Sequence, residues 1–219
     1  MPRFTLPFAL LLSLLAAPAA LAQTSLDGVG RITVAGGWRR TSNDTFLSGY
    51  YARPENQGLQ RGAPSPGGPL LVATFGYAVS EHVELGVDLF GSAERIRLSG
   101  APQLTTLTYG ALLGLRLQTL LEGVGPQGLL PWVGVLGGPT LVLSTFQGQP
   151  GTEGVKQAWG LTAGGSLRLT DRWAATMELR GLLARGPVKD LGSVNGGGVW
   201  LGLGATYTFD AEPSRPVNW

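Results

Sequence analysis

The chain has 219 residues, a formal net charge of +2 and no cysteine. So small a charge, scattered without a basic run, argues against a nucleic-acid partner. The lack of cysteine excludes disulfides, thiolate metal sites and a cysteine nucleophile. Many of the 35 glycines fall within strand-like segments, and a narrow barrel, whose interior must be filled by small side chains, has a use for them.

The first 22 residues have the pattern of a secretory signal peptide. Arg3 supplies the positive start, residues 8–17 the apolar run, and residues 20–22 (ALA) a small-x-small cleavage site. The apolar run is too short to cross a hydrocarbon core of about 30 Å comfortably, which argues against a membrane anchor. We therefore expect a signal peptide over 1–22, a barrel domain over 23–209 and a periplasmic tail over 210–219.

Eight later segments alternate apolar residues with small or polar ones at a period of two, which is the pattern of strands. The connections between them are in turn long, short, long, medium, long, short and long. Bacterial outer-membrane barrels have an even strand number, short periplasmic turns and longer outer loops. The pattern predicts an all-β, eight-stranded antiparallel up-and-down transmembrane β-barrel. The strands are expected at residues 30–38, 70–77, 82–90, 105–118, 130–145, 156–169, 173–184 and 198–209.

Three segments between or within these strands are less regular. Residues 39–69 form the longest loop, rich in proline and glycine at its end. Residues 119–128 are apolar as well as glycine- and proline-rich, and could hold a short helical turn. Residues 137–139 (GGP) could bend or bulge the fifth strand.

The charged strand residues indicate which face points to lipid. Six of them share a face with Gly, Ala and Thr, whereas the opposite face carries Leu, Val, Ala and Trp. A soluble barrel would turn the apolar face inward, but eight strands cannot enclose so many leucines. We therefore expect a charged lumen whose acids and bases pair, for instance Glu84 with Arg116, as a structural plug; a gated or ion-selective path is the alternative. The predicted lumen charges are Glu84, Asp88, Arg116, Arg168, Glu178 and Arg180.

Aromatic residues are expected to mark both membrane interfaces, because amphipathic rings prefer the headgroup region. Trp38 and Trp159 would lie at the outer boundary. The inner boundary would be marked by Tyr77, Trp132, Trp173, Tyr207 and Phe209.

The sequence contains no motif that predicts catalysis or a cofactor. A possible charge-relay set is only superficial: it consists of Ser80, Glu81, His82 and Glu84. Such polar residues are typical of a solvated turn. A single histidine and no cysteine make a transition-metal site improbable. The glycine-rich run at residues 195–198 lacks the Lys-Ser/Thr of a phosphate loop. We therefore expect no enzymatic activity, no cofactor and no bound metal.

The pattern over residues 28–209 resembles the small eight-stranded outer-membrane proteins: the OmpA-type transmembrane domain, OmpX and OmpW. Gly204, Tyr207 and Phe209 match the C-terminal insertion signal of that class. Two departures are Gly202, where the class usually has a polar residue, and the residues 210–219 that follow the last aromatic. The resemblance implies a location in the bacterial outer membrane, contact with its lipid, and insertion by the outer-membrane assembly machinery.

Three functions stay open at this point. The first is a structural or surface-exposed barrel whose loop 39–69 contacts a surface ligand. The second, suggested by the resemblance to OmpW, is a small channel or lateral-diffusion path for hydrophobic molecules. The third is a secreted soluble barrel that binds a ligand.

Overall fold

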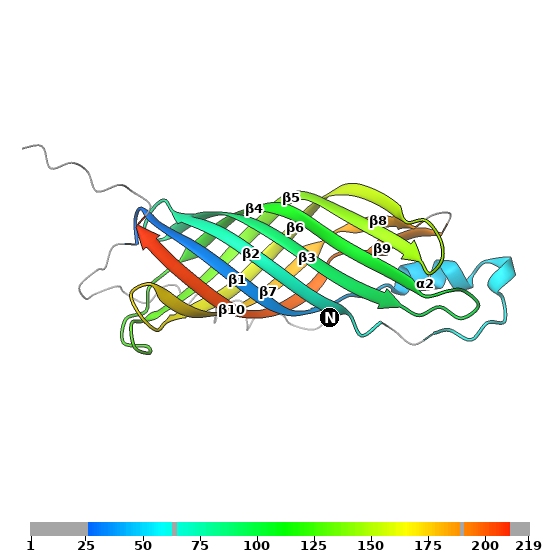
Figure 1. Ribbon diagram of the computed structural model, residues 1–219, viewed down its shortest axis with the longest axis horizontal. Coiled ribbons are helices and arrows are strands. Elements are labelled where there is room, and N and C mark those ends of the chain that lie inside the picture. Colours follow the sequence, from blue (N-terminus) through cyan, green and yellow to red (C-terminus); the bar gives the residue numbers. More distant parts are fainter. Residues whose placement is uncertain (1–25, 63–64, 189–190, 211–219) are drawn as a thin grey trace, which may run out of the picture.

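The computed structural model describes residues 26–62, 65–188 and 191–210, and these form a closed, all-antiparallel barrel of eight strands (Figure 1). Going round the barrel, the order is β1-β10-β7-β6-β5-β4-β3-β2. Each strand therefore pairs with the next barrel strand in sequence, and the last strand, β10, pairs with β1 to close the barrel. The last loop also holds a short hairpin (β8–β9). The barrel strands are β1 (Val29–Arg40), β2 (Gly68–Ala78), β3 (Val83–Ile96), β4 (Leu104–Gln118), β5 (Leu129–Phe146), β6 (Thr152–Arg168), β7 (Trp173–Leu183) and β10 (Gly198–Asp210).

The predicted fold class is confirmed, and the main differences lie at the strand ends. β3 continues to Ile96 because its pairing with β4 extends to the Ile96–Leu104 pair. β6 begins at Thr152, where it still pairs with Ser144 of β5. Residues expected in loops, including Glu94, therefore belong to the barrel wall.

The fifth strand runs without the bulge that the GGP sequence made possible. Gly110 pairs with Thr140 and Leu113 pairs with Gly137, so the register with β4 is the same on both sides of the GGP sequence. A Cβ on Gly138 would lie 2.3 Å from the carbonyl oxygen of Ala111. Glycine here therefore permits a close approach of β4 rather than a kink. The 119–128 connection contains turns and a single bridge between Leu121 and Leu129, without the helical turn considered from the sequence.

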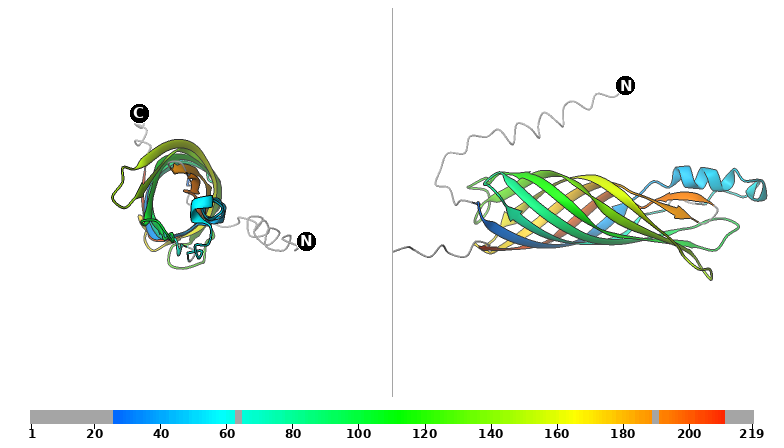
Figure 2. Two further views of the ribbon diagram at one scale, coloured as in Figure 1. Left: turned by 90° about the vertical axis from the view of Figure 1, so that its right-hand side faces the viewer. Right: turned by 90° about the horizontal axis from the view of Figure 1, so that it is seen from above.

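Ordered elements occupy two loops at the end of the barrel where the strands extend furthest (Figure 1). The first loop holds α2 (Asp44–Tyr51) and the short helix η1 (Pro54–Asn56). The last loop holds the hairpin of β8 (Arg185–Val188) and β9 (Gly192–Asn195). In the view along the barrel, the hairpin lies within the ring of strands and α2 at its inner edge (Figure 2). We call α2 and this hairpin the cap.

The outer surface of the barrel is apolar. Outward-facing Leu113, Leu161 and Leu183 are 70%, 66% and 79% exposed. None of the helices in the described part of the chain is long and apolar enough to cross a membrane. The exposed leucines Leu113, Leu161 and Leu183 lie on β4, β6 and β7, and they face away from the lumen.

Candidate functional site

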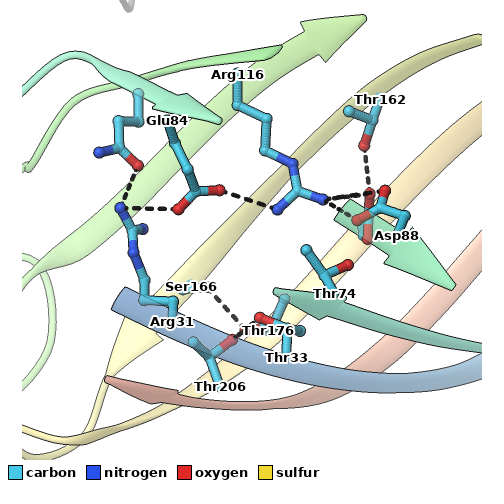
Figure 3. Close-up of polar contacts among 12 residues, drawn as sticks. Arg31, Thr33, Thr74, Glu84, Asp88, Arg116, Thr162, Ser166, Thr176 and Thr206 are labelled. Carbon is cyan, nitrogen blue, oxygen red and sulfur yellow. Dashed lines mark hydrogen bonds and ion pairs between the residues drawn. The ribbon is translucent and has the colours of Figure 1, made fainter. Parts of the chain in front are cut away.

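A network of ion pairs fills the lumen (Figure 3), toward the end of the barrel where β1 begins. Arg116 lies opposite Glu84 on the neighbouring strand, and its Nη1 is 3.1 Å from Glu84 Oε1. Its Nη2 is 3.2 Å from Asp88 Oδ1. Arg180 continues the network, with Nη1 at 2.7 Å from Asp88 Oδ2 and Nε at 2.6 Å from Glu178 Oε1. Five of the six predicted lumen charges thus form one continuous network.

The sixth predicted charge, Arg168, lies apart from this network. It is half-buried near the end of β6 and lines a vestibule of about 170 Å³ together with Arg31 and Asp210. Among the residues with described positions, no acid lies within ion-pair distance of it. Its place is taken by Arg31, whose Nη2 is 3.0 Å from Glu84 Oε2 and also donates to Gln118 Oε1 at 2.5 Å.

Arg31 was missing from the expected set, although the sequence held a signal for it. It shares the small-residue face of β1 with Thr33 and Ala35, and that face points into the lumen. With Arg31 included, the network holds three bases and three acids, each side chain no more than 9% exposed. A buried charge is strongly destabilising unless it is paired with an opposite charge. The equal numbers of bases and acids in the network allow every charge to be paired.

Hydroxyl groups close the remaining polar space beside the ion pairs (Figure 3). Thr206 contacts Thr33 at 2.7 Å and Thr176 at 2.6 Å, and Thr176 contacts Ser166 at 2.8 Å. The cavity left between these groups and the ion pairs is only about 10 Å³, about the space of one water molecule. This part of the lumen is therefore filled.

Trp132 was expected in the inner aromatic girdle, and the structure places it in the lumen instead. It is 6% exposed, and the Arg116 guanidinium carbon lies 5.7 Å from the centre of its ring. A Cβ on Gly164 would lie 2.5 Å from the ring, so the missing side chain makes room for it. The physical reason is strand periodicity: Trp132 shares the face of Gly134 and Gly138, which is the small, inward face of β5.

The other predicted girdle residues lie toward the outside. Trp38, Trp159 and Trp173 are 52%, 61% and 53% exposed. Tyr77, Tyr207 and Phe209 are partly exposed. Near one rim, Tyr207 packs between Trp173 and Phe209, with ring centroids 5.1 and 6.4 Å away.

A second layer of the lumen is apolar. Phe90 and Trp200 pack with ring centroids 4.9 Å apart, and both side chains are at most 5% exposed. Leucine, valine and alanine side chains from the surrounding strands complete this layer. Its members are Leu70, Val72, Phe90, Leu112, Leu136, Ala158, Leu182, Ala184 and Trp200.

Beyond the apolar layer, a fully buried ion pair connects the barrel wall to the cap. Arg39 Nη2 is 3.0 Å from Glu94 Oε2, and neither side chain is exposed to solvent. Arg39 also donates to the carbonyl oxygen of Gly196, just after the hairpin. Thr41, before α2, donates to Glu94 Oε1 at 2.6 Å. This pair was not predicted, because both residues lay in segments expected to be loops.

The cap closes the mouth of the barrel with an apolar cluster. Phe46, Leu47 and Tyr50 of α2 are at most 4% exposed and pack with Val188 and Val194 of the hairpin. The hairpin is tied to the loop before α2, since the Asn195 amide donates to Asn43 Oδ1 at 2.8 Å. Cap and wall thus form one packed unit.

A pocket of about 290 Å³ lies beside the cap, between α2, the β5–β6 end and the hairpin. Tyr50, Phe146 and Leu191 give it apolar walls. Ser144 also lines it; this side chain is 3% exposed, and its Oγ has no hydrogen-bond partner. The pocket is large enough for a small uncharged molecule.

The possible charge-relay set does not form a catalytic arrangement. His82 is exposed in the β2–β3 turn, whereas the Glu84 carboxylate points into the lumen and is bound by Arg31 and Arg116. Within the described ranges, no three His, Cys, Asp or Glu side chains gather as a metal site would require.

No protein-family model matches the chain, and no curated protein sequence does. Solved structures do match. The outer membrane protein OprG from Pseudomonas aeruginosa shares 15% sequence identity, with 84% of this chain and 97% of that one covered and a TM-score of 0.50. The chain has the fold of the small eight-stranded outer-membrane barrels. The attachment invasion locus protein Ail of Yersinia pestis, in complex with the heparin analogue sucrose octasulfate, gives the same TM-score at 11% identity, covering 84% of this chain and 99% of that one. At such identities the likeness establishes the fold alone.

Proposed function

We propose that this protein is a bacterial outer-membrane β-barrel with a filled lumen, exported by residues 1–22 and serving a structural or surface-interaction role. The fold and the exposed leucines of the barrel wall support a lipid environment. A secreted soluble barrel would present this surface to water, which is unfavourable for so extended an apolar area.

The observation that carries the proposal is the succession of layers in the lumen. The ion-pair network, the Phe90–Trp200 layer, the Arg39–Glu94 pair and the cap follow one another along the barrel. Eight strands enclose a space that side chains can fill, and here they leave about 10 Å³ inside the network. A solute path would require several of these layers to separate together.

The surface role is assigned to the end that carries the cap. Loop 39–69 contributes α2, and α2 contributes Tyr50 to the 290 Å³ pocket. We propose this pocket as the place where a surface ligand binds. Its apolar walls also favour a second candidate function, the uptake of small hydrophobic molecules, in which the pocket would be the entry point.

Assembly is assigned to the last strand. Gly204, Tyr207 and Phe209 form the proposed signal read by the outer-membrane assembly machinery. Phe209 lies opposite Gly30, where β10 pairs with β1 to close the barrel.

Membrane extraction followed by gel electrophoresis tests the proposal. The protein should remain in membranes washed with salt or carbonate and dissolve in detergent. The extracted protein should migrate differently before and after boiling, because a closed barrel resists unfolding in cold detergent. Release by carbonate, or identical migration of boiled and unboiled samples, would contradict a membrane-spanning barrel.

A further inference from the structure

The two ends of the barrel differ in the charges that they expose. At the cap end, several exposed bases make no ion pair with a described residue: Arg40, Arg95, Arg97, Lys156 and Arg185. Two of the acids there, Asp44 and Glu55, already contact Arg61 and Arg53. At the opposite end, the exposed charges are mostly acidic: Asp27, Glu122, Asp171 and Asp210, with Arg172 as the exposed base.

Two of the unpaired arginines face the same way as the lipid-facing residues. Arg40 follows Trp38 by two positions on the outward face of β1, and Trp38 is 52% exposed. Arg95 continues the outward face of β3 that carries Leu89. A step of two residues in a strand is about 7 Å. The Arg40 side chain therefore begins at the level where lipid headgroups follow the hydrocarbon region.

The start of β2 lies between the β1 and β3 ends that carry Arg40 and Arg95. The pairing of β1 with β2 ends at Arg39–Gly68, and the pairing of β2 with β3 ends at Leu70–Ser92. Just before β2, the backbone of Gly67 lies against the carbonyl oxygen of Arg39, and Ser65 Oγ donates to the carbonyl oxygen of Arg95 at 3.3 Å. Adjacent strands are about 4.8 Å apart, so β1 and β3, which have β2 between them, are about 10 Å apart.

Gly67 cannot be replaced by a larger residue without displacing the wall. Its φ is +89°, and a Cβ there would lie 1.9 Å from the carbonyl oxygen of Arg39. The backbone before Gly67 is also held to β1, because Trp38 Nε1 donates a hydrogen bond to the carbonyl oxygen of Pro66 at 2.9 Å. Gly67 thus adds no side chain between the strand ends that carry Arg40 and Arg95, and neither arginine makes an ion pair with a described residue.

We propose that Arg40 and Arg95 together bind a phosphate group of an outer-leaflet lipid. Guanidinium groups hold phosphate through paired, charge-assisted hydrogen bonds. A lipid headgroup is the source that fits, because both arginines extend from the lipid-facing side just beyond Trp38. The inference rests on the proposed function, which sets this end of the barrel at the outer leaflet.

Binding of lipid A to the detergent-folded full-length chain, measured by native mass spectrometry, tests this site. The probes are bis-phosphorylated lipid A and its fully dephosphorylated form. Arg40→Gln and Arg95→Gln should each weaken binding of the phosphorylated lipid about 5-fold, and together about 30-fold, as expected for a basic residue at an anionic membrane surface. The double lysine variant, Arg40→Lys with Arg95→Lys, should lose less than the double glutamine variant, because it keeps both charges.

Arg172→Gln is the matched control, because it removes an exposed arginine from the opposite rim. It should bind lipid A as the unchanged protein does, and the dephosphorylated lipid should bind the unchanged protein weakly. Equal binding by the double glutamine variant and the control, or equal binding of the two lipids, would overturn the inference. Tighter binding of a soluble heparin fragment than of lipid A, lost in the double variant, would also overturn it by assigning the arginines to a soluble polyanion.

Heat-modifiable migration of every variant separates this inference from the proposed function. Variants that keep the shift but do not differ in lipid binding contradict the phosphate site alone. If the unchanged protein shows no shift, the membrane assignment fails and the phosphate site fails with it.

Discussion

At the scale of single residues, two requirements decide where side chains of the lumen lie. A buried charge needs an oppositely charged partner, and a large side chain needs a neighbouring position that leaves room for it. Arg116 meets the first by contacting Glu84 and Asp88. Trp132 meets the second by lying over Gly164, where a Cβ would clash with its ring. These requirements explain why one of the predicted girdle residues, Trp132, lies inside the barrel while the others lie toward the outside.

The lumenal position of Trp132 predicts that it is shielded from lipid. In variants that keep a single tryptophan, with the others changed to phenylalanine, brominated acyl chains should strongly quench Trp159, which is 61% exposed. Trp132, 6% exposed, should keep most of its fluorescence. The measurement is the emission ratio in brominated and unbrominated vesicles. Equal quenching of the two would return Trp132 to the lipid-facing girdle.

Removing the central base of the ion-pair network should be costly. Arg116→Met leaves Glu84 and Asp88 without one of their cations in a buried site. Breaking a buried pair in this way typically costs about 3–5 kcal/mol. Urea unfolding of vesicle-inserted protein measures the free energy of unfolding. Arg172→Met, at an exposed turn, should stay within about 0.5 kcal/mol, and a similarly small loss for Arg116→Met would argue against a paired network.

At the scale of elements, the strands were predictable because successive side chains of a strand point to opposite faces, so apolar and polar residues alternate in the sequence. Leu85, Val87 and Leu89 face outward in β3, as expected from their alternation with Glu84 and Asp88. Strand ends were less predictable: Glu94 lay between the expected strands 82–90 and 105–118, yet pairing with β4 extends β3 to Ile96.

The cap was missed for a different reason. In α2, Phe46, Leu47 and Tyr50 have the spacing of a helix face, but eight residues give too few turns to stand out. The helix is stabilised by packing against Val188 and Val194, which are about 140 residues away in sequence. Such long-range packing leaves no local pattern that could have predicted it.

The last strand predicts opposite effects for two changes near its end. The Phe209 ring lies over Gly30, where a Cβ would be 2.5 Å from the ring, and it packs near Phe75 with centroids 6.3 Å apart. Phe209→Ala should therefore lower the amount of folded protein in the outer membrane, by loss of both the closure contact and the proposed signal. Deletion of residues 211–219, which lie outside the described residues, should leave the amount unchanged.

Quantitative blotting of outer-membrane fractions, with heat-modifiable migration as the readout of folding, measures both changes. Normal levels of folded Phe209→Ala would count against this strand as the insertion signal. A strong loss on deleting the tail would instead assign part of the signal to residues 211–219.

At the scale of the whole molecule, the lumen of the barrel is filled by layers of side chains and does not form an open pore. Charged, apolar, charged and apolar layers follow one another from the ion-pair network to the cap. Because each layer joins several strands, its contacts add to the backbone ladder that closes the barrel. The pocket beside the cap and the proposed Arg40–Arg95 site lie at one end, so the contacts proposed with other molecules are concentrated there.

The most direct test of the filled lumen is the conductance of planar bilayers containing the folded protein. Heat-modifiable migration of the same sample shows beforehand that the barrel is closed and folded. The account predicts no stepwise current above that of the protein-free bilayer, because the Phe90–Trp200 layer and the ion-pair network both block the path. Reproducible, stable current steps from the folded protein would contradict it and favour a channel.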